Sequence, residues 1–245
     1  MAALIAEFDG VSKLYGTFAA LRKVSVGFER GRCYLVLGPN GAGKSTLLRT
    51  LAGLLRPSYG KVRIFAADEP GGGVDPMEAR ERIGYMSHAT MLYDEFSGME
   101  NLRYFASLYH GRDCVAPQDA LRSVGLDPAL ERPVGQYSQG MKQRASLARV
   151  LISRPELLLL DEPFSNMDIA SAHQMLRLLE TFRTEQRTIL LTTHQRELAE
   201  PLADCVLTLE AGAVASLVDG PYATNGADGF EEALASSSGA RISAR

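Results

Sequence analysis

Hydrophobic positions recur with two different periods along the chain, and each period predicts a different element. Near the N-terminus, Val24, Val26 and Phe28 alternate with small or polar residues, as in a strand with one buried face. The next run, 33–37, is apolar throughout, which is typical of a central strand covered on both faces. A glycine-rich loop and a helical run at 45–55 follow, so a strand, a loop and a helix are predicted in direct succession.

Later segments repeat this contrast between short apolar runs and helical spacing. Further strands are predicted at 64–65, 83–86, 157–160, 188–192 and 205–209. Helical spacing covers the block 98–152 and the segment 169–183. The order of strands, a helical block and then strands separated by helices predicts an α/β fold, with a parallel core and an inserted helical subdomain.

The composition is that of a globular protein rather than a fibrous or disordered one. Of the 245 residues, 46% are hydrophobic and 22% are charged, so the chain can bury a large core. The net charge of −3 argues against nucleic acid as a partner, because chains that bind phosphate backbones are usually basic.

Cysteine usage and hydropathy both bear on the compartment. Cys33, Cys114 and Cys205 are far apart, odd in number and without C-x-x-C spacing, which argues against a disulfide framework or a zinc site. The sequence has no run of the ~18–20 apolar residues that a membrane span needs, and its start lacks the basic segment of a signal peptide. We therefore expect a cytoplasmic protein that reaches a membrane only through a partner.

The glycine-rich loop fits the phosphate-binding pattern G-x-x-x-x-G-K-[ST] in full, between a buried strand and a helix. Its candidate nucleotide-binding residues are Gly38, Pro39, Asn40, Gly41, Ala42, Gly43, Lys44, Ser45 and Thr46. Glycines let backbone N–H groups turn toward phosphates, and the helix N-terminus favours negative charge. We expect Lys44 to reach the β- and γ-phosphates and the Ser45 hydroxyl to bind Mg²⁺. Alone, the loop indicates only a nucleoside triphosphate, so a kinase, a GTPase and a motor stay open.

Two acidic residues end the apolar run at 157–160. A P-loop enzyme holds Mg²⁺ with an acid at the tip of a neighbouring strand, and Asp161 is the candidate. Glu162 is the candidate general base for the attacking water, a role that contributes typically ~10² to 10⁴ in rate. Two acids that simply end a strand before Pro163 are the alternative, and the P-loop upstream favours the metal-and-base interpretation.

The segment 137–144 carries the first family-specific pattern. It resembles the signature of ATP-binding cassette (ABC) proteins, usually Leu-Ser-Gly-Gly-Gln before a basic helix. Ser138 and Gly140 match this form, and the departures are Tyr137, Gln139 and Met141. Ser138 supplies a hydroxyl, Gly140 permits close backbone approach, and the following helix offers its N-terminus to an anion. Both matching residues are therefore candidate nucleotide contacts.

Further residues follow in the order of that family. Asp168 ends a segment that resembles the D-loop, His194 resembles the switch histidine that contacts the γ-phosphate, and Tyr15 resembles the aromatic residue that stacks on adenine. His88 stands where the family usually has Gln, and its imidazole can donate and accept, so it could position water or bind Mg²⁺. A half-buried tyrosine and a plain linker histidine are the alternatives for Tyr15 and His88. The candidate catalytic residues are Lys44, Glu162 and His194.

The resemblance spans about residues 6–217 and implies an organisation as well as an activity. It implies a P-loop NTPase core of mostly parallel sheet, with an antiparallel N-terminal β region and an inserted α-helical subdomain. Residues 1–87 and 153–220 correspond to the ATPase core and 88–152 to the helical signature subdomain, while the composition of 221–245, rich in Gly, Ala and Ser, predicts a flexible tail. ATP and Mg²⁺ are the implied cofactors, and ATP hydrolysis is expected to drive transport.

The same resemblance implies partners. It implies integral-membrane permease subunits and a head-to-tail homodimer, in which each ATP lies between the P-loop of one subunit and the signature of the other. The segment 92–109 is expected to receive a permease helix, with Phe96, Phe105 and Tyr109 as candidate contacts, although Phe105 also fits an ordinary core stripe. The chain is similar to the haem-exporter ATPase of cytochrome c maturation; exporters of drugs, lipids or polysaccharides, and a non-transport ABC ATPase, are the alternatives.

Overall fold

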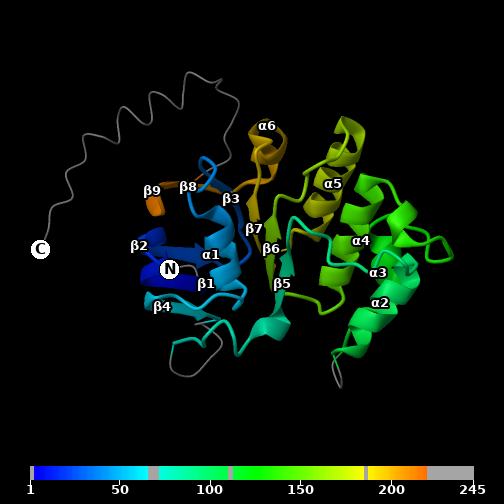
Figure 1. Ribbon diagram of the computed structural model, residues 1–245, viewed down its shortest axis with the longest axis horizontal. Coiled ribbons are helices and arrows are strands. Elements are labelled where there is room, and N and C mark those ends of the chain that lie inside the picture. Colours follow the sequence, from blue (N-terminus) through cyan, green and yellow to red (C-terminus); the bar gives the residue numbers. More distant parts are fainter. Residues whose placement is uncertain (1–2, 66–71, 110–112, 185–186, 220–245) are drawn as a thin grey trace, which may run out of the picture.

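The computed structural model describes residues 3–65, 72–109, 113–184 and 187–219. The predicted flexible tail at 221–245 lies outside these residues. The described chain forms two sheets and six α-helices (Figure 1). Within it, no helix is both long and apolar enough to cross a bilayer.

The smaller sheet is built from the N-terminal part of the chain. Its strands are β1 (Leu4–Tyr15), β2 (Phe18–Glu29) and β4 (Tyr59–Ile64), paired antiparallel in the order β2-β1-β4. Val24, Val26 and Phe28 are buried, as their alternation predicts. The strand predicted at 64–65 ends one residue early, because Phe65 adopts φ 56°, which lies outside strand geometry.

The larger sheet forms the centre of the molecule. Its strands are β3 (Cys33–Leu37), β5 (Ile83–Met86), β6 (Leu157–Asp161), β7 (Thr188–Thr192), β8 (Cys205–Glu210) and β9 (Ala213–Asp219). The order is β5-β6-β7-β3-β8-β9, parallel except for β9, which pairs antiparallel with β8. The sequence pattern did not predict β9, because this exposed edge strand carries only a weak apolar face.

Helix α1 (Lys44–Leu51) lies between the two sheets (Figure 1). Leu47, Leu48 and Leu51 share one hydrophobic core with residues of both sheets. The helix ends earlier than the predicted residue 55, because Gly53 takes a left-handed φ of 67°, the usual conformation just past a helix C-terminus. This packing fixes the start of α1, and with it the phosphate loop, against the larger sheet.

Helices α2–α5 cover the other side of the larger sheet, and the remaining helix lies beyond the end of β7 (Figure 1). They are α2 (Gly98–Ser107), α3 (Pro117–Ser123), α4 (Gln139–Leu151), α5 (Ile169–Phe182) and the short α6 (Arg196–Ala199). Single 3₁₀ turns occur at Arg80–Arg82, Val134–Gln136 and Glu200–Leu202. A second core joins helices α2–α5 to the facing side chains of β3, β6 and β7. The mixed α/β fold is thus confirmed, whereas the division at residues 88 and 152 stays a proposal.

Candidate functional site

The phosphate loop, residues 38–45, joins the end of β3 to the start of α1, and its shape requires glycine. A Cβ on Gly38 would stand 2.2 Å from the carbonyl oxygen of Leu209, and one on Gly43 would stand 2.5 Å from that of Ala20. Both glycines also have positive φ angles, 144° and 102°. No side chain caps the N-terminus of α1, so its first N–H groups are left for another acceptor.

Lys44 lies over this loop with its side chain mostly buried. Its ammonium group donates to the carbonyl oxygens of Gly38 at 2.7 Å and Pro39 at 3.1 Å. In the described residues no carboxylate lies within ion-pair distance of Lys44. A cation held only by neutral carbonyl groups favours the approach of an anion, because a buried charge is stabilised by an opposite one.

Asp161, at the end of β6, accepts hydrogen bonds from hydroxyl groups of three other elements. Its Oδ1 accepts from Ser45 Oγ and from Thr192 Oγ1, each at 2.9 Å, and its Oδ2 accepts from the Tyr85 hydroxyl at 3.3 Å. Arg49 Nε in turn donates to the Tyr85 oxygen at 3.3 Å. Burial raises the pKa of Tyr85, which keeps its hydroxyl protonated as a donor. Sequence reasoning missed Tyr85, since a strand tyrosine gives no signal of its own.

Glu162 and His194 meet beside Asp161. Glu162 has a φ of 58°, held by bonds from its N–H to the backbone and side-chain oxygens of Thr192. The backbone N–H of His194 donates to Glu162 Oε2 at 3.2 Å, and His194 Nε2 lies 3.3 Å from Oε1. Oε1 is buried, and no group of the described chain forms a well-directed hydrogen bond to it. No donor of the described chain therefore uses the lone pairs of this carboxylate oxygen.

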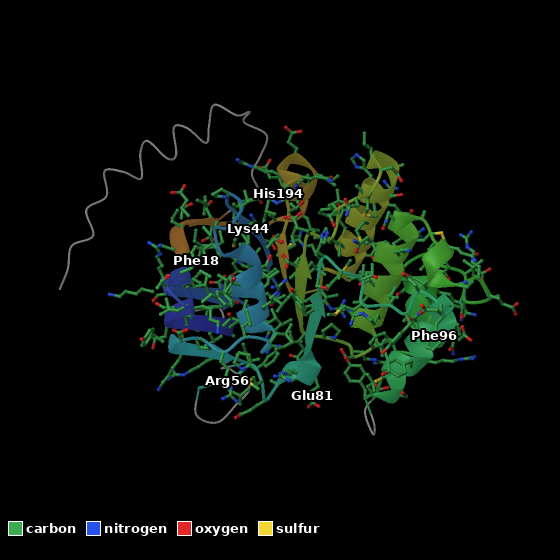
Figure 2. The ribbon with its side chains drawn as sticks, viewed as in Figure 1. Phe18, Lys44, Arg56, Glu81, Phe96 and His194 are labelled. Atoms are coloured by element: carbon green, nitrogen blue, oxygen red, sulfur yellow. The ribbon has the colours of Figure 1, made fainter. Side chains whose placement is uncertain are left out.

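Most of the phosphate loop, together with Glu162 and His194, lines one shallow pocket of about 270 Å³. Its lining comprises Tyr15, Phe18, Ala20, residues 40–46, Glu162 and His194. Figure 2 shows Lys44 and His194 close together in the upper part of the molecule, Phe18 on the left below them, and Arg56 and Glu81 at the lower end. Tyr15 and Phe18 are 49% and 56% exposed and are paired opposite each other in the β1–β2 hairpin. Sequence reasoning missed Phe18, although its place opposite Tyr15 across a two-residue turn could have indicated it.

Ser138, Gly140 and Asp168 lie together but outside this pocket. Ser138 caps α4 by accepting from the N–H of Met141 at 3.2 Å. Asp168 caps α5 by accepting from the N–H of Ser171 at 2.8 Å. A Cβ on Gly140 would stand 2.6 Å from Ser171 Oγ, so the starts of the two helices are in contact. Within one chain the signature residues therefore do not join the phosphate loop.

His88 follows β5 by two residues and does not line this pocket. Its Nδ1 lies 3.1 Å from Ser165 Oγ, which follows the acidic pair along the chain. In the described residues, no hydrogen bond joins His88 to Ser45 or Asp161. The proposed contact of His88 with Mg²⁺ thus has no support from the geometry of this chain, whereas a contact with the loop after Glu162 is present.

Comparison with known proteins agrees with this geometry. Residues 21–165 match the family model described as ABC transporter. A Nod factor export ATP-binding protein of Rhizobium johnstonii is 40% identical over 210 residues, which are 84% of this chain and 66% of that protein. The ABC transporter ATP-binding protein NatA of Bacillus subtilis is 37% identical over 199 residues, which are 80% of each.

A solved structure with the same fold is a dimeric ATP-binding cassette in a post-hydrolysis state, bound to ADP and Pi. It superposes with a TM-score of 0.76 at 23% identity and covers 87% of this chain and 98% of its own. The chain thus spans about two thirds of the Nod factor relative and nearly all of the solved cassette.

Proposed function

The chain belongs to the ABC transporter family, whose ATP-binding cassettes are ATPases coupled to transport, and we propose that it is the motor subunit of a membrane exporter. ATP binding is the shared property of this family. The proposal adds five points to this shared property: the Mg²⁺ ion, the roles of individual residues, the dimer, the membrane partner and the cargo. The observation that carries it is the convergence of the phosphate loop, Glu162 and His194 on one pocket, beside the Ser45–Asp161 contact.

Mg²⁺ fits the oxygen atoms at the edge of this pocket. Ser45 Oγ and Asp161 Oδ1 are hard oxygen ligands that lie 2.9 Å apart. Mg²⁺ is usually held by one or two protein oxygens together with waters and substrate phosphates. Ser45 would bind the ion directly and Asp161 would bind it directly or through water. The bound ion would neutralise charge on the β- and γ-phosphates.

The residues around the pocket have separate roles in ATP hydrolysis. The α1 N-terminus and Lys44 bind the phosphates, and Tyr15 and Phe18 offer ring faces to the adenine. The Glu162 carboxylate orients a water and takes its proton as the water oxygen attacks the γ-phosphorus. The bond between the γ-phosphorus and the β–γ bridging oxygen breaks, which gives ADP and phosphate. His194 donates to the γ-phosphate and positions Glu162.

We propose that a second copy of the chain completes the nucleotide pocket with its signature residues. The pocket holds about 270 Å³, slightly below the usual range of about 300–1,000 Å³ for ligand sites. Ser138 and Gly140 lie outside it, although the N-terminus of α4 has the chemistry to bind an anion. A two-fold partner would bring these residues to the phosphates through a self-complementary interface. ATP would then hold the dimer closed, and hydrolysis would release it.

The membrane partner is proposed to bind the aromatic side chains of the segment 92–109. Tyr93, Phe96 and Tyr104 are about 40–45% exposed there, whereas Phe105 and Tyr109 are partly buried. The Nod factor relative is named as an export protein, which favours export as the direction of transport. Haem is the narrower prediction for the cargo, and neither relative described above is named for it; export of another molecule, the alternative, is what the name of the Nod factor relative favours. The chain would then act at the membrane as a peripheral subunit.

The experiment that tests the proposal is a purification of tagged Glu162→Gln protein from native membranes, with ATP and in mild detergent. Removing the base while keeping the ATP site should trap the closed dimer on its partner. We expect an integral-membrane subunit to accompany this variant and to be lost from the matched Lys44→Ala control. Recovery of DNA-bound or ribosomal partners without any membrane protein would refute the exporter assignment, and haem-handling subunits would establish that cargo.

A further inference from the structure

One face of α4 packs against the segment 85–94 through three polar residues. Lys142 Nζ lies 3.6 Å from Asp94 Oδ1, Ser146 Oγ donates to the Thr90 carbonyl oxygen at 3.0 Å, and Arg149 Nη2 donates to the Tyr85 carbonyl oxygen at 3.4 Å. These positions are spaced by four and then three residues, which places them on one helix face. The charge of Lys142 is matched by a carboxylate, whereas that of Arg149 is not.

Arg149 is a largely buried cation without an anion. No carboxylate of the described chain lies within ion-pair distance of its guanidinium group. Its Nε is fully buried and has no hydrogen-bond acceptor there, and its single backbone bond is long. Desolvation lowers the pKa of Arg149, the direction expected when a positive charge loses water without gaining a partner. A buried charge of this kind is costly until a counter-charge arrives.

The surroundings of Arg149 are aromatic and face outward. Its guanidinium lies 5.2 Å from the centre of the Phe105 ring, and Phe105 packs against Tyr93 and Tyr104. Tyr93 also contacts Phe96, which Figure 2 shows on the side of the molecule away from Phe18. We call the set Tyr93, Phe96, Tyr104 and Phe105 the aromatic cluster. The cluster therefore presents an apolar surface, and its Phe105 lies beside the Arg149 guanidinium.

None of the three acidic residues of the segment 92–109, which are Asp94, Glu95 and Glu100, forms an ion pair with Arg149 in the described chain. Asp94 pairs with Lys142, and Glu100 accepts from both the N–H and the hydroxyl of Ser97 in the capping box of α2. The described chain therefore supplies no counter-charge to Arg149, and a bound partner can supply one. An aromatic surface selects apolar side chains, and a guanidinium selects a carboxylate, with which it can form two parallel hydrogen bonds.

We propose that Arg149 anchors a carboxylate of the membrane subunit, an Asp or Glu flanked by apolar residues that pack on the aromatic cluster. This inference rests on the proposed function, because it names the chemistry of the partner that the segment 92–109 receives. The contact would connect that partner to α4, whose N-terminus carries Ser138 and Gly140. Movement of the membrane subunit would then be transmitted along a rigid helix to the signature residues.

A zero-length cross-link tests the proposal on the intact complex. The Arg149→Lys variant keeps the charge and introduces an amine, which a water-soluble carbodiimide joins to any carboxylate in direct contact. We expect one amide cross-link from position 149 to an Asp or Glu of the membrane subunit recovered with the chain, identified by mass spectrometry. The matched control is Arg122→Lys, because Arg122 is exposed on α3 and already pairs with Asp119.

Retention of the membrane subunit gives a second readout. Arg149→Leu should weaken its binding by on the order of 30-fold or more, since breaking a buried charge pair leaves the other charge alone. ATP binding by the isolated variant should be unchanged, which shows that it folds. An intact complex without the cross-link, with Arg149→Leu retained like wild type, would refute the role of Arg149 only. Absence of any membrane subunit with the wild-type chain would instead refute the proposed function.

Discussion

Ser45 Oγ donates to Asp161 Oδ1 at 2.9 Å, which joins the first turn of α1 to the end of β6 across 116 residues of sequence. The two residues come from the two motifs that indicate nucleotide chemistry most clearly. They meet because β3 and β6 run parallel in one sheet, with β7 between them, so their carboxyl ends share an edge. Thr192, at the end of β7, completes the contact by donating to the same oxygen.

Asp161→Asn should impair the use of Mg²⁺ more than the binding of ATP. The amide keeps the size of the side chain but removes the charge that would hold the ion beside Ser45. Loss of a group that orients a metal ligand typically lowers metal affinity ~10- to 100-fold, so the Mg²⁺ concentration for half-maximal ATPase should rise by that factor. A titration of ATPase rate with Mg²⁺ measures it, with Asp119→Asn on the exposed face of α3 as the control. Equal Mg²⁺ dependence of both variants would contradict the assignment.

The parts of this site that the sequence could predict are those with a short, ordered pattern. The glycine loop and the acidic pair each follow an apolar strand, so their positions at strand ends were fixed by local sequence. Tyr85 could not be predicted, because its role comes from the pairing of β5 with β6, a contact between segments far apart. The position of Arg149 could not be predicted for the same reason. Its lack of an ion-pair partner depends on how α4 packs against the segment 85–94.

The aromatic residues of the β1–β2 hairpin should both support nucleotide binding. Stacking of an aromatic ring on a base contributes about 1–3 kcal/mol, so Phe18→Ala and Tyr15→Ala should each weaken ATP binding about 5- to 150-fold. Equilibrium binding of a fluorescent ATP analogue measures the effect. Tyr59→Ala is the matched control, because Tyr59 is 66% exposed in the same sheet but does not line the pocket. A loss confined to Tyr15→Ala would show that Phe18 has no part in binding.

Gly140 should tolerate no side chain while Ser171 is present. A Cβ at this position would stand 2.6 Å from Ser171 Oγ and 2.8 Å from Ser171 Cβ. Overpacking of this kind typically costs about 1–3 kcal/mol, so Gly140→Ala should lower the free energy of unfolding by that amount. The double variant Gly140→Ala, Ser171→Gly removes both contacts and should recover most of the loss in a urea titration. Equal stability of the single and double variants would contradict the proposed clash.

The fold rather than the pattern of cysteines decides thiol chemistry. Burial raises the pKa of Cys33 to about 12 and that of Cys205 to about 11, so both stay protonated near neutral pH. Because the thiolate is the reactive form, we expect iodoacetamide at pH 8 to modify only the half-buried Cys114 in the native protein. Mass spectrometry counts the adducts. The control is the protein unfolded in urea, in which all three cysteines should be modified. A folded pKa above the unfolded one also means that stability falls as the pH rises from about 9 to about 11.

His194 should matter for hydrolysis and little for ATP affinity. Its backbone N–H donates to Glu162 Oε2 and its ring reaches the other oxygen, so the side chain can both position the base and donate to the γ-phosphate. Removal of one such donor typically lowers the rate ~10²- to 10³-fold, which we expect for His194→Ala in a single-turnover assay. His173→Ala is the matched control, because His173 shares with His194 a second pocket between α5 and α6 but does not line the phosphate pocket. If both variants lost the same activity, or if His194→Ala lost ATP binding instead of hydrolysis, the catalytic assignment would be wrong.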